Sequence, residues 1–129
     1  MFLSNTILLA AELKKLMEDR CHPELHDETY IVAHISAGSD GRSGYIDIIA
    51  PTRNVCNIKI VIRYAILHIS QEQIAEIATK LKDGDTINVH DNGISVCREY
   101  KMKIDKFDHF STAQVERTAK EIVDIMQSL

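Results

Sequence analysis

The chain has 129 residues, which fits one domain large enough to bury a core without disulfide or metal support. Apolar residues make up 45% and charged residues 26%, so neither a disordered nor a membrane-spanning chain is expected. The net charge of −4 argues against duplex nucleic acid as the main partner, because such binders usually present a basic face to phosphates. Three distant cysteines, Cys21, Cys56 and Cys97, favour a reducing cytoplasm over a disulfide framework.

The first element expected is an amphipathic helix over about residues 4–20, capped by Ser4 or Asn5. The segment lacks the basic leader of a signal peptide. The polar run HPELHDE at 22–28 is expected to end this helix. The predicted buried stripe consists of Leu9, Leu13, Leu16 and Met17.

The periodicity then becomes alternating, which indicates strands over 29–36 and 45–50 and a longer strand from about residue 55. The Gly- and Ser-rich segment 37–44 and the PTRN segment 51–54 supply the turns. The long strand has the clearest alternation. Its inward side chains are predicted to be Ile58, Ile60, Ile62, Tyr64 and Ile66.

Serine followed three residues later by glutamine is a capping box, and it predicts the starts of two further helices. The first helix begins after Ser70 and ends near 82–85; its predicted buried stripe is Ile74, Ile77, Ala78 and Leu81. The second begins after Ser111, and its predicted stripe is Val115, Ala119, Ile122, Met126 and Leu129.

Between these helices, residues 86–104 alternate around Asn92-Gly93, a dipeptide typical of a type I′ hairpin turn. A two-residue loop at this point predicts three facing pairs: Asn88 with Cys97, Val89 with Val96, and His90 with Ser95. The apolar face of the hairpin then contains Ile87, Val89, Ile94, Val96, Tyr100, Met102 and Ile104.

The predicted order is α-β-β-β-α-β-β-α, and no internal repeat or linker divides the chain. We therefore expect a single α+β domain over residues 1–129, in which three helices cover one face of an antiparallel sheet of about five strands. The uncovered face mixes apolar and polar residues, which favours self-association. Its apolar members are Val32, Ile49, Val61 and Leu67.

An up-and-down course of the first three strands brings several polar side chains to one end of the sheet. Positive charge beside an aromatic ring suits a nucleotide-like anion. The candidate ligand-binding residues are His34, Arg42, Tyr45, Arg63 and His68.

The triplet His-Ile-Ser occurs twice in this region, at 34–36 and 68–70. It resembles the paired His-x-Ser/Thr motifs of two-histidine phosphoesterases, where one imidazole is the general base and the other the general acid. That family places its motifs in two pseudo-symmetric lobes of a longer chain, whereas only 34 residues separate them here. Ser70 also serves as a helix cap. We therefore predict no catalytic residues, no metal site and no cofactor, and keep phosphodiester cleavage as an alternative.

The element order, the length and the isoelectric point of about 5.8 are similar to those of class I type III secretion chaperones. That resemblance implies a cytoplasmic dimer that holds an extended segment of another protein. We therefore predict a non-enzymatic cytoplasmic binding protein, a homo-oligomer that sequesters or masks a partner, as small acidic immunity proteins and inhibitors also do. A binder of a nucleotide-like small molecule is the first alternative.

Overall fold

The computed structural model describes residues 2–27, 29–39, 41–67, 70–91 and 93–128. This part forms three helices and a six-stranded antiparallel sheet, so the predicted α+β fold is confirmed, with one strand more than expected. The elements in chain order are α1 (Phe2–Met17), β1 (Cys21–Asp27), β2 (Tyr30–Ile35), β3 (Arg42–Thr52), β4 (Val55–Leu67), α2 (Gln71–Lys80), β5 (Thr86–His90), β6 (Gly93–Asp105) and α3 (Thr112–Met126). Short 3₁₀ turns follow α1 and precede α3.

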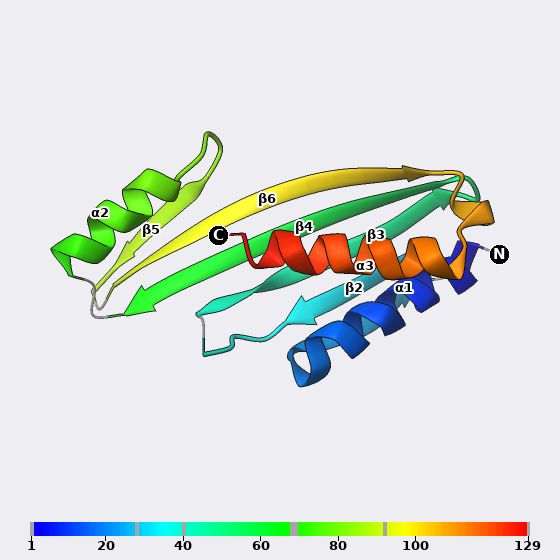
Figure 1. The fold of residues 1–129 in the computed structure, drawn as a ribbon, viewed down its shortest axis with the longest axis horizontal. Coiled ribbons are helices and arrows are strands. Elements are labelled where there is room, and N and C mark those ends of the chain that lie inside the picture. The colour runs from blue at the N-terminus through cyan, green and yellow to red at the C-terminus, as the bar shows by residue number, and fades with distance from the viewer. Residues whose placement is uncertain (1, 28, 40, 68–69, 92, 129) are drawn as a thin grey trace.

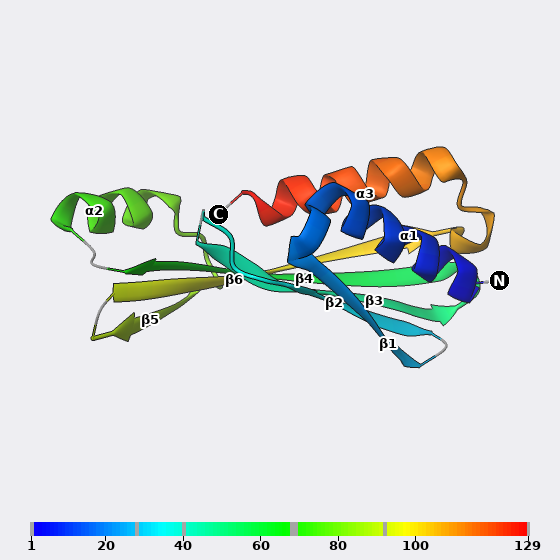
Figure 2. The same cartoon turned by 90° about the horizontal axis from the view of Figure 1, so that it is seen from below.

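The sheet has the strand order β1-β2-β3-β4-β6-β5, and its longest pairing is that of β4 with β6. Helices α1 and α3 lie side by side over one face, and α2 lies over the same face at the far end (Figure 1; Figure 2). We name this the covered face. No helix of the described chain lies on the other face, which we name the open face (Figure 2). Because strand side chains alternate, each strand contributes to both faces.

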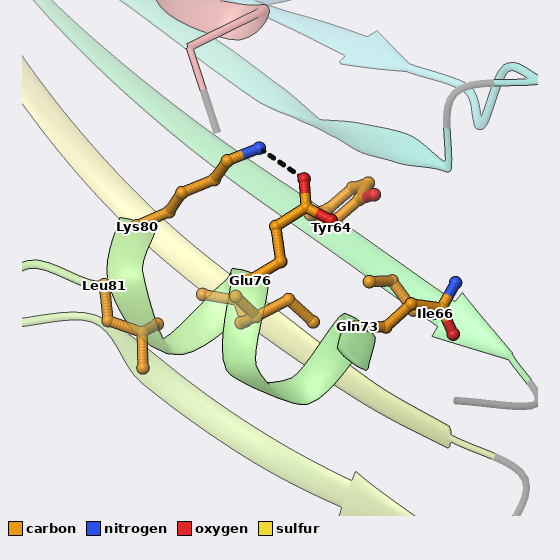
Figure 3. Close-up of a pocket in the computed structure, with 8 residues that line it drawn as sticks. Tyr64, Ile66, Gln73, Glu76, Lys80 and Leu81 are labelled. Atoms are coloured by element: carbon orange, nitrogen blue, oxygen red, sulfur yellow. Dashed lines mark hydrogen bonds and ion pairs between the residues drawn. The ribbon is translucent and has the colours of Figure 1, made fainter. Parts of the chain in front are cut away.

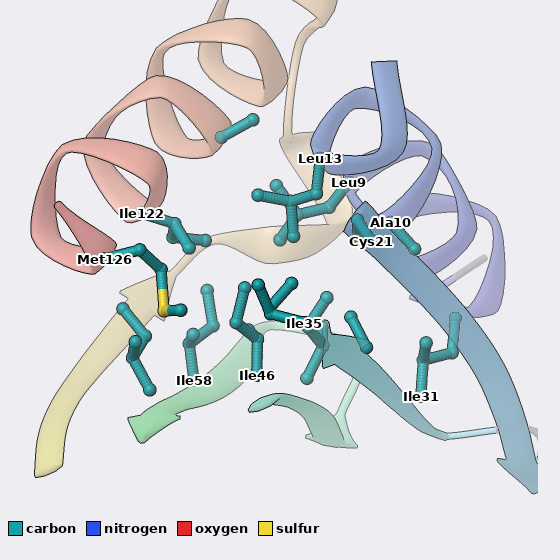
Figure 4. Close-up of a cluster of buried hydrophobic side chains, with 14 of the residues drawn as sticks. Leu9, Ala10, Leu13, Cys21, Ile31, Ile35, Ile46, Ile58, Ile122 and Met126 are labelled. Carbon is teal, nitrogen blue, oxygen red and sulfur yellow. The ribbon is translucent and has the colours of Figure 1, made fainter. Parts of the chain in front are cut away.

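The core lies between the covered face and helices α1 and α3, and it is almost entirely aliphatic (Figure 4). The buried helix side chains include Leu9, Leu13, Ala119, Ile122 and Met126, and those of the central strands Ile46, Ile48, Ile58, Ile60 and Ile62. The inward stripe predicted for β4 is thus confirmed in its first half. Tyr64 and Ile66 are only half-buried, because β4 continues beyond α1 and α3 toward α2 (Figure 1).

Helix α1 begins and ends earlier than residues 4–20, so the predicted capping role of Ser4 or Asn5 is wrong. Both residues lie inside the first turns of the helix. The Asn5 side chain instead donates a hydrogen bond to the carbonyl of Phe107, which ties α1 to the turn before α3. Leu16, predicted to be buried, is exposed.

The polar segment predicted to end the first helix is strand β1, at one edge of the sheet and paired antiparallel with β2. The burial of its first residues alternates: Cys21 is buried in the core and Pro23 is half-buried, whereas His22 and Glu24 are exposed. Pro23 hides this pattern, since proline lacks the N–H that a central strand needs. An edge strand tolerates proline because its outer N–H groups have no strand partner.

The hairpin of β5 and β6 is present, but each predicted pair is displaced by two residues. Val89 lies opposite Ile94, and Gly93 already belongs to β6. The two-residue loop is therefore 91–92, so the predicted Asn92-Gly93 turn is wrong; Asn92 itself lies outside the described residues. A displacement by two keeps every side chain on its face, so the predicted apolar face is preserved.

Both predicted capping boxes are present. Ser70 accepts a hydrogen bond from the backbone N–H of Gln73, and the Gln73 side chain accepts one from the Ser70 N–H. Ser111 and Gln114 repeat this arrangement at α3. The buried stripe of α3 is also confirmed, except at Leu129, which lies outside the described residues.

Candidate functional site

The open face brings together three of the five side chains predicted to bind a ligand. His34 of β2, Tyr45 of β3 and Arg63 of β4 line one shallow depression of about 430 Å³. Backbone pairing fixes this arrangement, because His34 lies opposite Tyr45 and Arg63 lies opposite Ser43. The other lining residues are His22, Ile35, Ser36, Ser43, Gly44, Val61 and Cys97.

The remaining two predicted residues are placed differently. Arg42 lies on the covered face, because it pairs with Tyr64 and successive strand residues alternate. Its guanidinium carbon lies 5.1 Å from the centroid of the Tyr64 ring, a cation–π contact. The structure therefore separates Arg42 from the depression, and His68 lies outside the described residues.

The polar side chains of the depression are arranged in two adjacent rows across the strands. The first row contains His22, His34, Tyr45 and Val61, and the second contains Ser43, Arg63 and Cys97. Neighbouring strands are about 4.8 Å apart, so three strands place their side chains across about 10 Å. Sequence reasoning missed His22, Ser43 and Cys97; the alternation of β1 was the available signal for His22.

The depression contains an arginine, Arg63, in a chain of net negative charge. Arg63 is exposed and makes no hydrogen bond or ion pair with another described residue, and no aspartate or glutamate is among the lining residues. Glu24 stands at the margin of the depression, and the Oε2 atom of Glu24 lies 3.8 Å from Nε2 of His34. Lys59 adds a positive charge 5.9 Å from the Tyr45 ring centroid, and Tyr45 and Glu99 raise the pKa of that lysine.

A second depression, of about 390 Å³, lies further along the open face between β3, β4 and β6. Its lining includes Ile49, Lys59, Lys101 and Lys103. Asp47 also lines this depression, and its buried carboxylate accepts a hydrogen bond from the Tyr30 hydroxyl at 3.0 Å. This depression thus combines an apolar side chain with a lysine-rich margin.

The hydroxyls of the two His-Ile-Ser triplets have structural roles. Ser36 donates to the carbonyl oxygen of Arg20 from both its backbone N–H and its side chain. Ser70 caps α2. Both hydroxyls thus take part in contacts with the backbone.

The thiol of Cys21 and the imidazole of His22, which are neighbours in sequence, do not form a common metal-binding site. Cys21 is buried in the core while His22 is exposed on the open face. Burial raises the pKa of Cys21 and raises the pKa of Cys56 to about 12, so both thiols stay protonated at neutral pH. Among the described residues, no group of three or more His, Cys, Asp or Glu is placed to hold a metal ion.

A second exposed surface is the arm, residues 71–90, which contains α2 and β5 and extends beyond α1 and α3 (Figure 1). In α2 the predicted buried stripe is wrong for Ile74 and Ala78, which are exposed, and right for Ile77. A slot of about 70 Å³ remains between α2 and the sheet, lined in part by the Lys80–Glu76 ion pair (Figure 3). The helix is thus only loosely packed on the sheet.

Arg98 anchors the arm to β6. Its Nε and Nη2 donate to the two carboxylate oxygens of Asp85 at 2.9 and 2.7 Å, and Nη2 also donates to the carbonyl of Lys80 at 2.7 Å. The Arg98 and Asp85 side chains are only 6% and 4% exposed. Because Lys80 ends α2 and Asp85 precedes β5, one guanidinium holds both ends of the connection.

The outer strand of the arm, β5, is exposed along its whole length. It is the last strand in the sheet order and pairs with β6 on its inner side. Ile87 and Val89 are 44% and 82% exposed, and Ile74 of α2 is 47% exposed. The arm therefore presents apolar side chains beside an open strand edge.

Comparison with protein-family models, with curated proteins and with solved structures gives no significant match. No helix in the described ranges is long and apolar enough to cross a bilayer. Function is therefore inferred from the two exposed surfaces, the arm and the open face.

Proposed function

We propose that the protein is a non-enzymatic binding protein that works as a homodimer, with the arm as the dimer contact and the open face as the surface that holds a partner protein. The observation that carries this proposal is the exposed edge of β5. Its residues Thr86–His90 include neither proline nor a charged side chain. Edge strands of single-chain proteins usually carry such protection, because an open edge pairs readily with another strand.

Two copies of β5 can pair antiparallel about a twofold axis that passes by Asn88. In this register Ile87 of one copy lies opposite Val89 of the second copy, and the contact occurs twice. Both side chains are on the covered face of the sheet, since their partners on β6 are Val96 and Ile94. The pairing buries apolar surface that is exposed in the single chain, which favours association.

The arrangement of α2 supports the same contact. This helix lies over the covered face at the end where β5 is the outer strand (Figure 2). Twofold pairing of β5 therefore brings two α2 helices toward each other above the joined strands. The exposed Ile74 then has an apolar environment available to it.

The open face supports a partner protein as the second component. Its half-buried Ile49 lies among Lys59, Lys101 and Lys103, in the depression between β3, β4 and β6. An apolar centre with a polar margin is the usual composition of a protein interface. The resemblance in element order to class I type III secretion chaperones, with one additional strand here, supports a dimer whose partner is a protein segment.

The Val89→Lys substitution should convert the dimer into a monomer, because it places two ammonium groups within the pairing of two β5 strands. Light scattering coupled to size-exclusion chromatography at about 20 µM measures the mass, since assembly depends on concentration. The matched control is Leu25→Lys, which changes an exposed apolar residue of the opposite edge strand and should remain dimeric. A wild-type protein that is monomeric at about 100 µM contradicts the homodimer.

The partner surface has its own test. Wild-type protein immobilised on a resin should retain a partner protein from an extract of its source cells, and Ile49→Lys should lose it, because the charge interrupts the apolar centre of the open face. Leu8→Lys, an exposed position on α1, is the control and should retain the same partner. Unchanged retention by a folded Ile49→Lys variant rules out this part of the open face.

A further inference from the structure

We propose that the depression around Arg63 is a binding site for a small phosphate-bearing molecule. This site is separate from the proposed dimer contact, because its lining residues come from β1–β4, β6 and the segment after β2, and none belongs to the arm. Three observations define the ligand class. Among the described residues, the guanidinium of Arg63 has no partner and the lining holds no carboxylate, and the donor side chains stand in two adjacent rows.

The guanidinium of Arg63 differs from those of two other arginines beside the sheet. Arg98 is bound by Asp85 at 2.7 Å, and Arg53 lies 3.5 Å from Asp108. Arg63 has no such contact within the described residues and is exposed. A guanidinium presents pairs of N–H groups in a planar fork that matches phosphate and carboxylate oxygens.

The neighbours of Arg63 favour a phosphate over a carboxylate. His34 and the hydroxyl of Ser43 line the same depression, so donors are available from three strands. A phosphate group offers three acceptor oxygens, whereas a carboxylate offers two. Strands β2 and β4 are two strand spacings apart, about 10 Å, which leaves room for one phosphate between His34 and Arg63.

The charges that flank the depression are of both signs. No described residue that lines the depression carries a carboxylate. Lys59 stands next to Tyr45 and adds positive charge, although Glu99 lies 3.9 Å from that lysine and Glu24 lies near His34. The acidic groups therefore stand at the margin, and the centre of the depression keeps the arginine.

Tyr45 adds an aromatic ring to the site. It is half-buried in the row between His34 and Val61. Nucleobases stack on aromatic side chains with little dependence on base identity. A phosphate with an attached base, such as adenosine monophosphate, therefore uses more of the depression than inorganic phosphate does.

The test is isothermal titration of the full chain with adenosine monophosphate and with inorganic phosphate at low ionic strength, where exposed charges are least screened. The Arg63→Gln variant should bind at least ~10-fold more weakly, because a charge-assisted hydrogen bond is lost. Arg117→Gln, an exposed arginine on α3, is the matched control and should bind as the wild type does.

The two probes identify the source of the phosphate. Equal affinity for both supports a site for the phosphate group alone, and a preference for the nucleotide that Tyr45→Leu abolishes supports a nucleotide site. No binding of either probe at ~10 mM, succinate binding as tight as phosphate, or full affinity in a folded Arg63→Gln variant overturns the proposal. Monomeric Val89→Lys should still bind, so failure of the homodimer and failure of this site are distinguishable.

Discussion

The Asp85→Ala variant should be less stable than the wild type by about 3–5 kcal/mol, the usual cost of removing one partner of a buried ion pair. The substitution leaves the Arg98 guanidinium buried beside a missing carboxylate. Because Arg98 also binds the carbonyl at the end of α2, the whole connection between α2 and β5 loses its anchor. Urea denaturation followed by circular dichroism measures the change.

The contribution of Asp85 also has a defined pH dependence. Its hydrogen bonds with Arg98 are the main cause that lowers the pKa of Asp85 in the folded protein. Folding therefore favours the ionised carboxylate. Its stabilising contribution is fully present above the pKa of the unfolded carboxyl, about 3.9, and is lost as the pH falls through the lower folded pKa. The stability difference between wild type and Asp85→Ala should thus be constant near neutral pH and shrink in acid.

Glu76→Ala provides the matched control, because Glu76 pairs with Lys80 and both side chains are mostly exposed to solvent. Breaking an exposed ion pair between residues one helical turn apart should lower the free energy of unfolding by at most about 0.5 kcal/mol. The double replacement Asp85→Leu with Arg98→Met should recover most of the loss, since no buried charge is left without a partner. Similar small losses for Asp85→Ala and Glu76→Ala would show that the buried pair is not an anchor.

The Gly44→Ala substitution should also be strongly destabilising, by about 3 kcal/mol or more. Gly44 has a φ of +148°, and a Cβ placed on it lies 1.9 Å from the carbonyl oxygen of Val61. That oxygen belongs to the backbone of β4, so it cannot move aside as the end of a flexible side chain could. The pairing of β3 with β4 must therefore open in the middle of the sheet, which thermal or urea unfolding detects.

Gly84→Ala separates backbone strain from this steric conflict. Gly84 also has a positive φ, +90°, but a Cβ there meets nothing within 4 Å. Its replacement should cost only the strain of the left-handed region, about 1–2 kcal/mol. Equal losses for the two variants would contradict the close approach of β3 and β4 at Gly44.

The sequence predicts the central elements well because their signals are local and strong. The alternation along β4 and the two capping boxes each depend on a few neighbouring residues. Strand β1 was missed because Pro23 suppresses its signal, and proline is tolerated only through the edge position, which depends on the whole sheet. The hairpin register was missed because the long pairing of β6 with β4 starts at Gly93. That glycine therefore belongs to a strand and not to the turn.

The candidate site was predictable in part for similar reasons. Connectivity alone places the ends of β2, β3 and β4 together, which correctly groups His34, Tyr45 and Arg63 at one depression. The face on which each side chain lies depends on where pairing begins, and β3 begins at Arg42 instead of Tyr45. Arg42 then falls on the covered face, whereas Ser43 and Cys97 join the depression through pairing with Arg63.

The opposite edge of the sheet determines how far the proposed assembly extends. In the proposed dimer the β5 edge of each copy is paired with the β5 edge of the other. The two β1 strands then form the outer edges of the joined sheet. Pro23 removes one N–H from β1, and the charged side chains of Glu24 and Asp27 disfavour a further strand beside them. Growth therefore stops at two chains, so a concentrated solution should contain closed dimers and no filaments.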